Sequence, residues 1–534
     1  MAEYLAPGVF IEEIERGPRP IEGVPTSTAA FLGETERGPI RPRLVTSYSE
    51  YARVFGGTFG DDKYMPYAAT GFFENGGKRM YVCRLVREDA RTAEVDIGGG
   101  FTLRACGAGG WGNQIAVQVL DSTTTRGAEK KPVGFRIRVA LISAADTDKS
   151  GSPFDPKSGV RHDGVIEDFD DLEADERSPN YYGKRLPFID EAKGERQAGG
   201  TSSAYIVLVR SDKADPMPAR RDKADDFVRL SAGEDGSSDL TAADFEGNVP
   251  ARSARTQVQG LAALELDPYR DVSLVYAPGR SDRDVVSKIV SHCERQRFRF
   301  AVIDAERGID DVSSGALDPR TSLADSSYAA FYYPWITISD PQTGARKLVP
   351  PGGHTVGVYA RTDVERGVFK SPANEILRGA LDLQFDINDF TQETLNPRGV
   401  NVTRSFPGRG IRVWGARTLS SNGLWKYVSV RRLFIFLERS IYEGTQWVVF
   451  EPNDDRLWAR VKDTIRLFLR TQWRNGALFG RTEDEAFSIV CDRSTMTQDD
   501  ILNGRLVCEI GIAPVRPAEF VIFRIFQSTA EAQR

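Results

Sequence analysis

The chain contains one glycine-rich segment with the spacing of a dinucleotide-binding loop. Residues 107–112 read Gly-Ala-Gly-Gly-Trp-Gly, which satisfies the pattern Gly-x-Gly-x-x-Gly. In a phosphate-binding loop this pattern follows a strand and opens a helix. Here the next residues, 113–119, alternate as a strand does. The segment therefore favours a tight turn over a cofactor site. A Gly-x-x-x-x-Gly-Lys-Ser/Thr sequence, which would bind a nucleoside triphosphate, does not occur.

The residue types that most often carry catalysis or bind metals are sparse. The three histidines are His162, His292 and His354, and none belongs to a metal-binding pair or a recognisable nucleophile motif. His292 precedes Cys293 on a predicted helix, where adjacent residues point apart. Acidic pairs at residues 454–455 and 499–500 fall at predicted helix starts, where they complement the helix dipole. We therefore expect no enzymatic activity, no catalytic or metal-binding residue and no cofactor.

Composition and cysteine usage indicate a soluble protein made in the cytoplasm. At 534 residues the chain is too long for one hydrophobic core. It has no apolar run of ~18 residues, and its first residues lack a secretory signal. The five cysteines are widely spaced without a Cys-x-x-Cys pair, which is typical of reduced thiols. They are Cys83, Cys106, Cys293, Cys491 and Cys508.

Charge is unevenly distributed along the chain. The net charge of −6 gives no reason to expect nucleic-acid binding. Residues 378–534 contain 22 Lys and Arg against 19 Asp and Glu, a net charge of +3. Residues 1–377 therefore have a net charge of −9. If the C-terminal part faces a charged partner, that partner should be acidic.

The best-defined predicted helix spans residues 454–474. Asn453 can cap its start, and Gly476 can end it. At 100° per residue an apolar face forms, made of Leu457, Trp458, Val461, Ile465, Phe468 and Leu469. The opposite face is basic and consists of Arg456, Arg460, Lys462, Arg466, Arg470 and Arg474. This basic face is either a solvated surface or a docking stripe for an acidic partner.

Both ends of the chain have the composition of β-strands. The N-terminal strand would contain Val9, Phe10, Ile11 and Ile14, and prolines at positions 18 and 20 would end it. The C-terminal strand, residues 517–527, would contain Phe520, Val521, Ile522, Phe523, Ile525 and Phe526. Such strands either complete the chain's own sheet or pair with another chain.

The elements between the ends predict a multidomain α+β protein. Residues 28–33 and 80–86 are predicted strands, and residues 49–55 and 65–75 are predicted helices. Residues 272–304 predict a β-α-β unit whose helix is capped by Ser281. The expected division is an N-terminal arm at 1–22, a body segment at 23–87, an inserted β-rich domain at 88–255, an α/β middle domain at 256–377, a C-terminal domain at 378–516 and a C-terminal arm at 517–534.

Short sequence blocks in a fixed order run through nearly all of the chain outside the insertion. They lie at residues 6–13, 25–33, 332–335, 349–351, 360–363, 371–374, 410–418, 427–432, 450–453 and 513–520, and one further block, 111–113, lies at the first strand of the insertion. The densest block, 410–418, reads Gly-Ile-Arg-Val-Trp-Gly-Ala-Arg-Thr. Together the blocks resemble the sheath proteins of contractile tails, which occur in myophages, R-type bacteriocins and extracellular contractile injection systems.

The resemblance implies a fold and a role. The fold would be α+β multidomain: a C-terminal α+β sheath core domain inside, extended N- and C-terminal β arms, a middle domain containing the β-α-β unit, and an inserted β-rich outer domain. The arms would add strands to neighbouring subunits and link stacked rings of the same chain. Further partners would be an inner tube protein, baseplate proteins and terminator or cap proteins, with no nucleic acid and no membrane insertion. Contraction from an extended state would drive the tube through a target envelope. Assembly would take place in the bacterial cytoplasm, as part of a phage tail or tail-like particle.

Three readings compete. The strongest is a contractile sheath subunit, of an extracellular contractile injection system or alternatively of a myophage tail. Within this sheath reading, a type VI secretion sheath fits less well because such sheaths are built from two different chains. A non-contractile capsid or tail protein would assemble without changing length. A hydrolase would need a clustered nucleophile, base or metal site.

Overall fold

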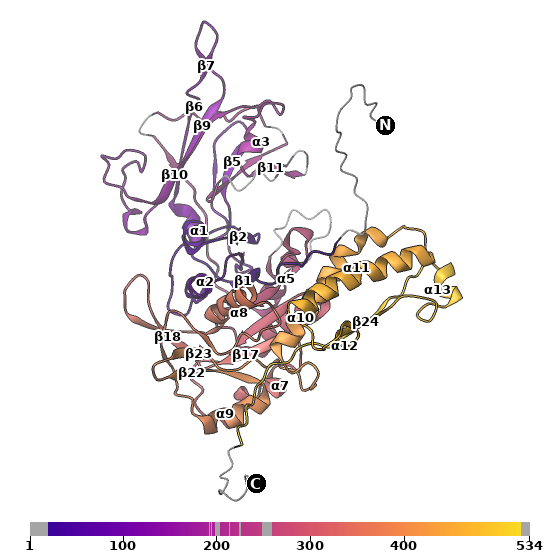
Figure 1. The fold of residues 1–534 in the computed structure, drawn as a ribbon. Helices are drawn as coiled ribbons and strands as arrows, with labels where there is room; N and C mark the ends of the chain where they lie inside the picture. Colours follow the sequence, from indigo (N-terminus) through magenta and orange to yellow (C-terminus); the bar gives the residue numbers. More distant parts are fainter. Residues whose placement is uncertain are drawn as a thin grey trace, which may run out of the picture. The chain divides into compact units, whose positions relative to one another are not determined.

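The computed structural model describes residues 20–247, apart from 192, 194, 198–202, 213 and 224–225, and residues 259–524. The chain divides into two compact units (Figure 1). The larger unit is Pro25–Arg431. In the smaller unit, the described residues are 20–24 and 432–524.

A mixed sheet of nine described strands forms the centre of the larger unit. In spatial order the strands are β2 (Arg43–Val45), β3 (Met80–Arg84), β1 (Ala29–Gly33), β15 (Leu274–Tyr276), β16 (Phe300–Asp304), β17 (Ala329–Tyr333), β22 (Val400–Phe406), β23 (Gly410–Val413) and β20 (Glu375–Ile376). The strands from β3 to β22 run parallel. The edge strands β2 and β20 pair antiparallel with their neighbours, and β23, next to β20, is antiparallel to β22 as well. Parallel strands need helical crossovers, so this sheet is covered on both faces.

Helices supply the two covering layers of the central sheet. They are α1 (Tyr48–Phe55), α2 (Met65–Glu74), α4 (Ala242–Glu246), α5 (Gly260–Leu264), α6 (Arg283–Gln296), α7 (Pro319–Ser322), α8 (Gly352–Arg366) and α9 (Asp389–Leu395). On one face, Ala30 and Leu32 of β1 belong to a buried cluster with Val286 and Ile289 of α6. On the other face, Phe31 packs edge-on against a ring of α2. The alternation follows from the two-residue period of a strand.

The predicted β-α-β unit is confirmed. Strands β15 and β16 are parallel, and α6 connects them with its apolar stripe buried. The predicted cap is wrong: Asp282, not Ser281, occupies the N-cap position, and its side chain makes no capping hydrogen bond. The predicted strands at 28–33 and 80–86 and the two N-terminal helices are present as β1, β3, α1 and α2.

Asp304 joins three elements at the end of β16. Its carboxylate is fully buried and accepts hydrogen bonds from Tyr276 Oη (2.6 Å), Gly279 N (3.1 Å) and Gly352 N (2.8 Å). Gly352 begins α8, so the carboxylate satisfies a backbone donor that the helix leaves unpaired. A Cβ at Gly352 would lie 2.2 Å from the Tyr276 ring, which explains the glycine. Burial raises the pKa of Asp304 to about 7, although its hydrogen bonds act in the opposite direction.

The predicted β-rich insertion forms two sheets. One sheet has the order β10 (His162–Leu172), β9 (Phe135–Ile142), β6 (Ile115–Asp121) and β14 (Val228–Arg229). The other has the order β12 (Glu195–Gln197), β11 (Phe188–Asp190), β13 (Ile206–Arg210), β5 (Phe101–Ala105) and β4 (Glu94–Asp96). A hairpin of β7 (Thr125–Arg126) and β8 (Lys131–Pro132) projects from the first sheet, between β6 and β9, and α3 (Tyr182–Arg185) lies beside β11 (Figure 1).

The insertion begins and ends at one place. Arg91 and Glu234 exchange backbone hydrogen bonds of 2.8 and 3.0 Å, so the entering and leaving chains lie side by side. The expected end at residue 255 differs from the structure, because Phe245 of α4 already belongs to the core of the central sheet. Composition placed that boundary too late, since the polar residues around α4 resemble those of the insertion.

The expected boundary between residues 377 and 378 also differs from the structure. Strands β22 and β23 follow it in sequence but extend the same sheet to which β17 belongs. A smaller sheet crosses the same point, with the order β19 (Arg346–Val349), β18 (Ile336–Ser339) and β21 (Ala380–Leu383). These backbone pairings join segments that are far apart in sequence, so composition does not reveal them. The boundary between the two units therefore lies at residues 431 and 432.

The smaller unit is built on a helical pair. Helix α10 (Val428–Gly444) enters it, and α11 (Asp455–Arg474) packs beside α10, with the rings of Phe436 and Phe468 6.0 Å apart (Figure 1). A two-stranded sheet follows, made of β24 (Phe487–Val490) and β25 (Glu509–Ile512). The short helices α12 (Glu483–Ala486) and α13 (Gln498–Leu502) complete the unit.

We predict that Asp304→Ala lowers the free energy of unfolding of the larger unit by at least about 2 kcal/mol. The substitution leaves three buried or half-buried donors without an acceptor, and each such loss costs about 1–3 kcal/mol. Chemical denaturation at pH 6, below the raised pKa of Asp304, measures the change. The matched control is Asp310→Ala, at an exposed position, which should change stability by less than about 0.5 kcal/mol. Equal effects of the two substitutions would contradict the prediction.

Candidate subunit interfaces

The C-terminal segment carries a run of apolar side chains in solvent. Residues 516–524 form no strand with any described part of the chain. Phe520, Val521, Ile522 and Phe523 are 70, 68, 78 and 84% exposed. The predicted strand therefore does not complete the chain's own sheet over its described residues. Ile525 and Phe526 lie outside the described residues.

The N-terminal end of the described chain belongs to the same unit as the C-terminal segment. Val24 N donates a hydrogen bond to Ser440 Oγ of α10 (3.2 Å). A Cβ at Gly444 would lie 2.7 Å from Ile21, so the glycine permits this close packing. The predicted arm residues Val9, Phe10, Ile11 and Ile14 lie outside the described residues, and their pairing stays a prediction.

The sheet formed by β24 and β25 has only two strands among the described residues. Its antiparallel register pairs Phe487 with Ile512 and Val490 with Glu509. The ladder continues past β25, because Ala513 N donates to Ala486 O and Ala513 O accepts from Phe479 N. A sheet of two strands is marginal by itself in water, and both of its outer edges can accept further strands.

The amphipathic helix is confirmed as α11, with all six predicted apolar residues buried. Its predicted cap is wrong. Asp454 is the N-cap, and its carboxylate accepts from Leu457 N at 2.8 Å. Asn453 instead accepts from the indole nitrogen of Trp458 at 2.8 Å. An acidic residue at this position also complements the helix dipole, which favours it over the neutral asparagine.

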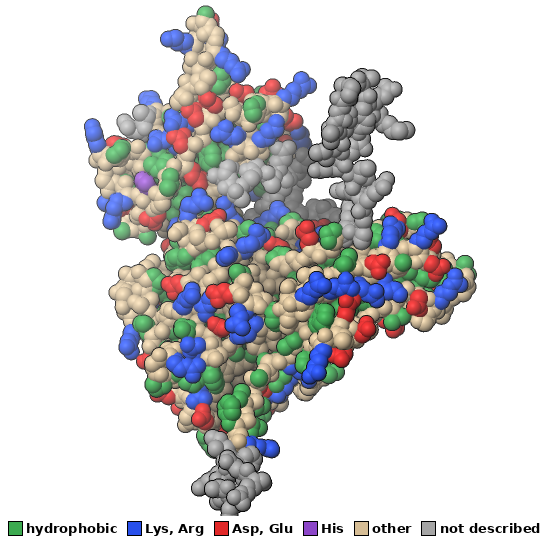
Figure 2. All heavy atoms as spheres, viewed as in Figure 1, with side chains coloured by type: hydrophobic (Ala, Val, Ile, Leu, Met, Phe, Trp, Pro, Cys, Tyr) green, Lys and Arg blue, Asp and Glu red, His purple; other side chains and the backbone are tan. Residues whose placement is uncertain are grey.

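The basic face of α11 divides into paired and unpaired cations. A row of basic side chains crosses the surface over this helix, with acidic side chains beside it (Figure 2). Arg460 pairs with Glu451 at 2.9 Å, and Arg466 and Arg470 pair with Glu483 at 3.5 and 2.7 Å. The hydrogen bond from Arg470 lowers the pKa of Glu483. Within the described chain, the remaining members of the face make no ion pair; they are Arg456, Lys462 and Arg474.

Two exposed aromatic residues of the smaller unit escaped the sequence analysis. Phe450 is 103% exposed and has φ +70°, a conformation that costs a bulky residue energy. Phe479 is 71% exposed and bonds through its backbone to the segment after β25. Phe450 lies in the sheath-like block 450–453, and this was the sequence signal that could have identified it. No local pattern marks Phe479, because only tertiary pairing places it beside the C-terminal segment.

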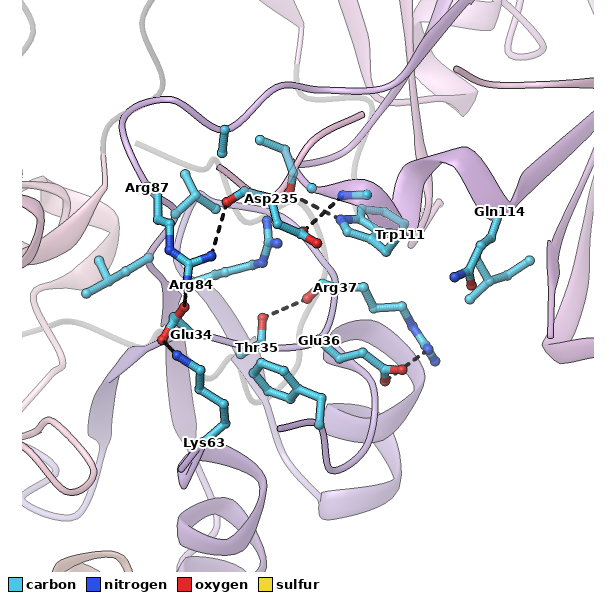
Figure 3. A pocket seen from close by; sticks show the side chains of 18 residues that line it. Glu34, Thr35, Glu36, Arg37, Lys63, Arg84, Arg87, Trp111, Gln114 and Asp235 are labelled. Atoms are coloured by element: carbon cyan, nitrogen blue, oxygen red, sulfur yellow. Dashed lines mark hydrogen bonds and ion pairs between the residues drawn. The ribbon is translucent and has the colours of Figure 1, made fainter. Parts of the chain in front are cut away.

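Residues 108–111 of the glycine-rich segment line a cavity of about 400 Å³ between the insertion and the central sheet (Figure 3). The segment forms a short 3₁₀ turn before β6, as the sequence predicts. Asp235 Oδ1 accepts from Gly110 N (2.9 Å), so a carboxylate already holds an amide that a phosphate would need. A Cβ at Gly107 would lie 2.2 Å from Gly38 O. These glycines therefore serve close packing of the insertion on the body.

Ion pairs strengthen the same junction. Glu34 lies between Lys63 and Arg87 and pairs with both (Figure 3). Arg84 is 4% exposed, and burial lowers its pKa to about 10. Arg84 donates to Gly38 O at 3.3 Å. The charged residues around this cavity therefore connect the insertion to the body. The residues that line it include no nucleophile next to a base.

The histidines do not form a reactive site. His292 and His354 are buried, and burial lowers their pKa values to about 3 and about 4. His162 is exposed at the start of β10. The described residues contain no cluster of three or more potential metal ligands. Over the same residues, every helix is too short or too polar to cross a bilayer.

Sequence comparison identifies the family. A model described as phage tail sheath protein central domain matches residues 252–419, and one described as phage tail sheath C-terminal domain matches residues 420–528. A prophage major tail sheath protein of Pseudomonas aeruginosa is 24% identical over 52% of this chain and 71% of its own length. The tail sheath protein of Burkholderia phage BcepMu is 27% identical over 45% of this chain and 53% of its own length.

Solved structures share the fold. The sheath complex of an extracellular contractile injection system, PVC, in the contracted state has a TM-score of 0.58 at 22% identity, with both chains fully covered. The contracted helical sheath of the anti-feeding prophage has a TM-score of 0.55 at 22% identity over 98% of this chain and 100% of that one. A sheath tail protein from Listeria innocua has a TM-score of 0.55 at 12% identity over 93% of this chain and 96% of that one. With two family models covering residues 252–528, just over half of its length, the chain belongs to the phage tail sheath family.

Proposed function

We propose that this chain polymerises around an inner tube as the sheath of an extracellular contractile injection system. The sheath assembles in an extended, metastable state, and its contraction drives the tube through a target envelope. The observation that carries the proposal is the exposed apolar segment Phe520–Phe523 in a unit that also holds an open two-stranded sheet. The chain acts as a structural part and not as an enzyme.

The C-terminal segment can reach well beyond its own fold. Nine described residues, 516–524, follow the last residue that is hydrogen-bonded through its backbone to residues 477–486. At about 3.3 Å per residue, an extended segment of this length spans about 30 Å. Its exposed apolar side chains lose contact with water when the segment pairs with a sheet in another subunit. This supports its role as an arm, in which Ile525 and Phe526 continue the same strand.

The open sheet β24–β25 is the proposed acceptor for arms from neighbouring copies. Added strands would satisfy the outer backbone groups and cover half-buried side chains such as Ile510 and Ile512. The N-terminal arm, with Val9, Phe10, Ile11 and Ile14, would supply a strand of the same kind. Backbone ladders of this type keep subunits connected while their domains move during contraction.

The basic face of α11 is the proposed contact with an acidic inner tube. Arg460, Arg466 and Arg470 have intramolecular carboxylate partners, which reduces the charge they offer to another protein. Arg456 and Arg474 are exposed and have no such ion pair within the described chain. They are therefore the members of the face best suited to bind a carboxylate of the tube.

The remaining partners follow from the same proposal. The sheath would contact baseplate proteins at one end and a terminator or cap protein at the other. Assembly would take place in the bacterial cytoplasm without a nucleotide, nucleic acid or membrane anchor.

A myophage tail sheath is the second candidate, favoured by relatives such as the BcepMu protein. Those phage relatives match by sequence over 39–56% of the chain. The injection-system sheaths align with it by structure over 98–100%, and the Listeria innocua sheath protein aligns by structure over 93%. Electron microscopy of particles purified from the source bacterium separates the candidates. Striated tubes without capsids, in long and short forms, support the injection system. Capsid-bearing tails support the phage, and tubes of one length contradict contraction.

We predict that deleting Phe520–Arg534 abolishes sheath polymerisation but leaves a folded subunit. The deletion removes the proposed arm and no described strand of the fold. Negative-stain microscopy and circular dichroism measure assembly and folding. Deletion of residues 124–133, the β7–β8 hairpin of the insertion, is the control and should leave assembly intact. Normal sheaths from the C-terminal deletion would refute the arm role; deletion of residues 1–16 tests the N-terminal arm in the same way.

We predict that the pair Arg456→Glu and Arg474→Glu weakens assembly of the sheath on its tube. Charge reversal replaces attraction by repulsion, and the defect should shrink between about 0.05 and 0.5 M salt because salt screens exposed charges. Sedimentation of sheath with purified tube measures the effect. The control is Arg126→Glu with Lys131→Glu, whose side chains are 79 and 77% exposed on the hairpin of the insertion. An equal defect in both variants would indicate that the basic face of α11 is only a solvated surface.

A further inference from the structure

Two cysteines flank the strands of the small C-terminal sheet. Strand β24 ends at Val490 and β25 begins at Glu509, and these two residues are paired. One step beyond this pair, Cys491 lies opposite Cys508. Their side chains lie close enough for each to influence the pKa of the other. Both are free thiols in the structure.

The register of the sheet places this pair at a position that accepts a disulfide. Ala513 N donates to Ala486 O, which makes 486 and 513 a hydrogen-bonded pair. Hydrogen-bonded and non-hydrogen-bonded pairs alternate along an antiparallel ladder. Counting along it, Val490 and Glu509 are hydrogen-bonded, and Cys491 and Cys508 are the next, non-hydrogen-bonded pair. Such pairs have Cα atoms about 4.5 Å apart, within the disulfide range of about 4.4–6.8 Å.

The two thiols differ in access. Cys491 is 2% exposed, whereas Cys508 is half-buried and can meet a small reagent. The half-buried thiol is therefore suited to react first, and its buried neighbour to displace the reagent. Cys106 is also half-buried, but its Sγ donates to Ala204 O at 3.0 Å instead of contacting a thiol.

We propose that Cys491 and Cys508 form an intramolecular disulfide that ties β24 to β25 when the protein meets a small disulfide oxidant such as oxidised glutathione. The Cys508 thiolate attacks one sulfur of the oxidant, and the other glutathione leaves as a thiol after taking up a proton. The Cys491 thiolate then attacks the Cys508 sulfur and releases the second glutathione. Two protein thiols are oxidised, and one oxidant disulfide is reduced to two thiols.

The bond would close the loop of residues 492–507, which carries α13. Closing a loop restricts the unfolded chain and so stabilises the folded sheet. The consequence for assembly rests on the proposed function, because the cross-linked strands are those assigned there to accept arms. The sheet would be reduced while subunits assemble in the cytoplasm and could be locked after the particle reaches oxidising surroundings.

Burial sets the pH dependence of the reaction. Burial raises the pKa of Cys508 to about 12 and raises the pKa of Cys491 as well. Thiolates are therefore scarce at neutral pH. The initial rate of oxidation should rise about tenfold per pH unit below that range, because only the thiolate attacks.

The test uses the full-length, reduced chain incubated with oxidised glutathione and mapped by proteolysis and mass spectrometry without reduction. We expect a peptide pair joined through Cys491 and Cys508, with a mass lower by two hydrogens. Thermal unfolding of the oxidised protein should also shift upward by a few degrees and return on reduction. Failure to form this linked pair, or linkage through other cysteines, would overturn the inference without affecting the sheath proposal.

Single substitutions provide the controls. Cys508→Ser and Cys491→Ser should each abolish both the linked peptide and the thermal shift. Cys106→Ser removes a half-buried thiol that has no thiol neighbour and should preserve both. Position 508 is half-buried and accepts serine more easily than the buried position 491. The comparison of Cys508→Ser with Cys106→Ser therefore remains decisive if Cys491→Ser folds poorly. A thermal shift that survives in Cys508→Ser would contradict the inference.

Discussion

The C-terminal segment exposes apolar side chains to water that the described part of its own chain does not bury. Phe520–Phe523 are 68–84% exposed, and residues 516–524 form no strand there. An extended apolar segment in water gains stability by joining a sheet edge. Every copy of the chain offers such an edge in its two-stranded sheet β24–β25. If copies of the chain exchange this segment, its apolar side chains become buried and the open edge of the sheet gains a strand. The proposed polymer depends on this exchange.

The rest of the fold is built so that each body remains intact while such links are made. The parallel strands of the larger unit are buried on both faces, and Asp304 fastens β16, the turn after β15 and the start of α8 together. The chain enters and leaves the insertion side by side at Arg91 and Glu234, and charged residues around Glu34 strengthen the junction. A contracting sheath requires bodies of this kind, because the work of subunit movement is lost if the domains themselves deform.

Local patterns predicted the elements whose signals lie within one stretch of sequence. The periodicity of α6 and α11, the β-α-β unit and the turn at the glycine-rich segment were all confirmed. Caps were less predictable, because both members of the pairs Ser281/Asp282 and Asn453/Asp454 can cap a helix. In the second pair side-chain contacts distinguish them: Asn453 accepts from the Trp458 indole, and Asp454 accepts from Leu457 N. Domain boundaries failed for a related reason: Phe245 and strands β22–β23 join the central sheet through pairings with residues far away in sequence.

The sequence by itself indicated membership of the tail sheath family, which the family models confirm. The ordered sheath-like blocks depend only on residue identity and order. The tertiary structure decided which groups face each other: Glu451 and Glu483 against the arginines of α11, Asp235 against the glycine-rich turn, and Cys491 against Cys508. Such pairs are 9 to 125 residues apart in sequence. Hydrogen bonds and ion pairs act over a few ångströms of space, so chain folding, and not sequence spacing, selects their partners.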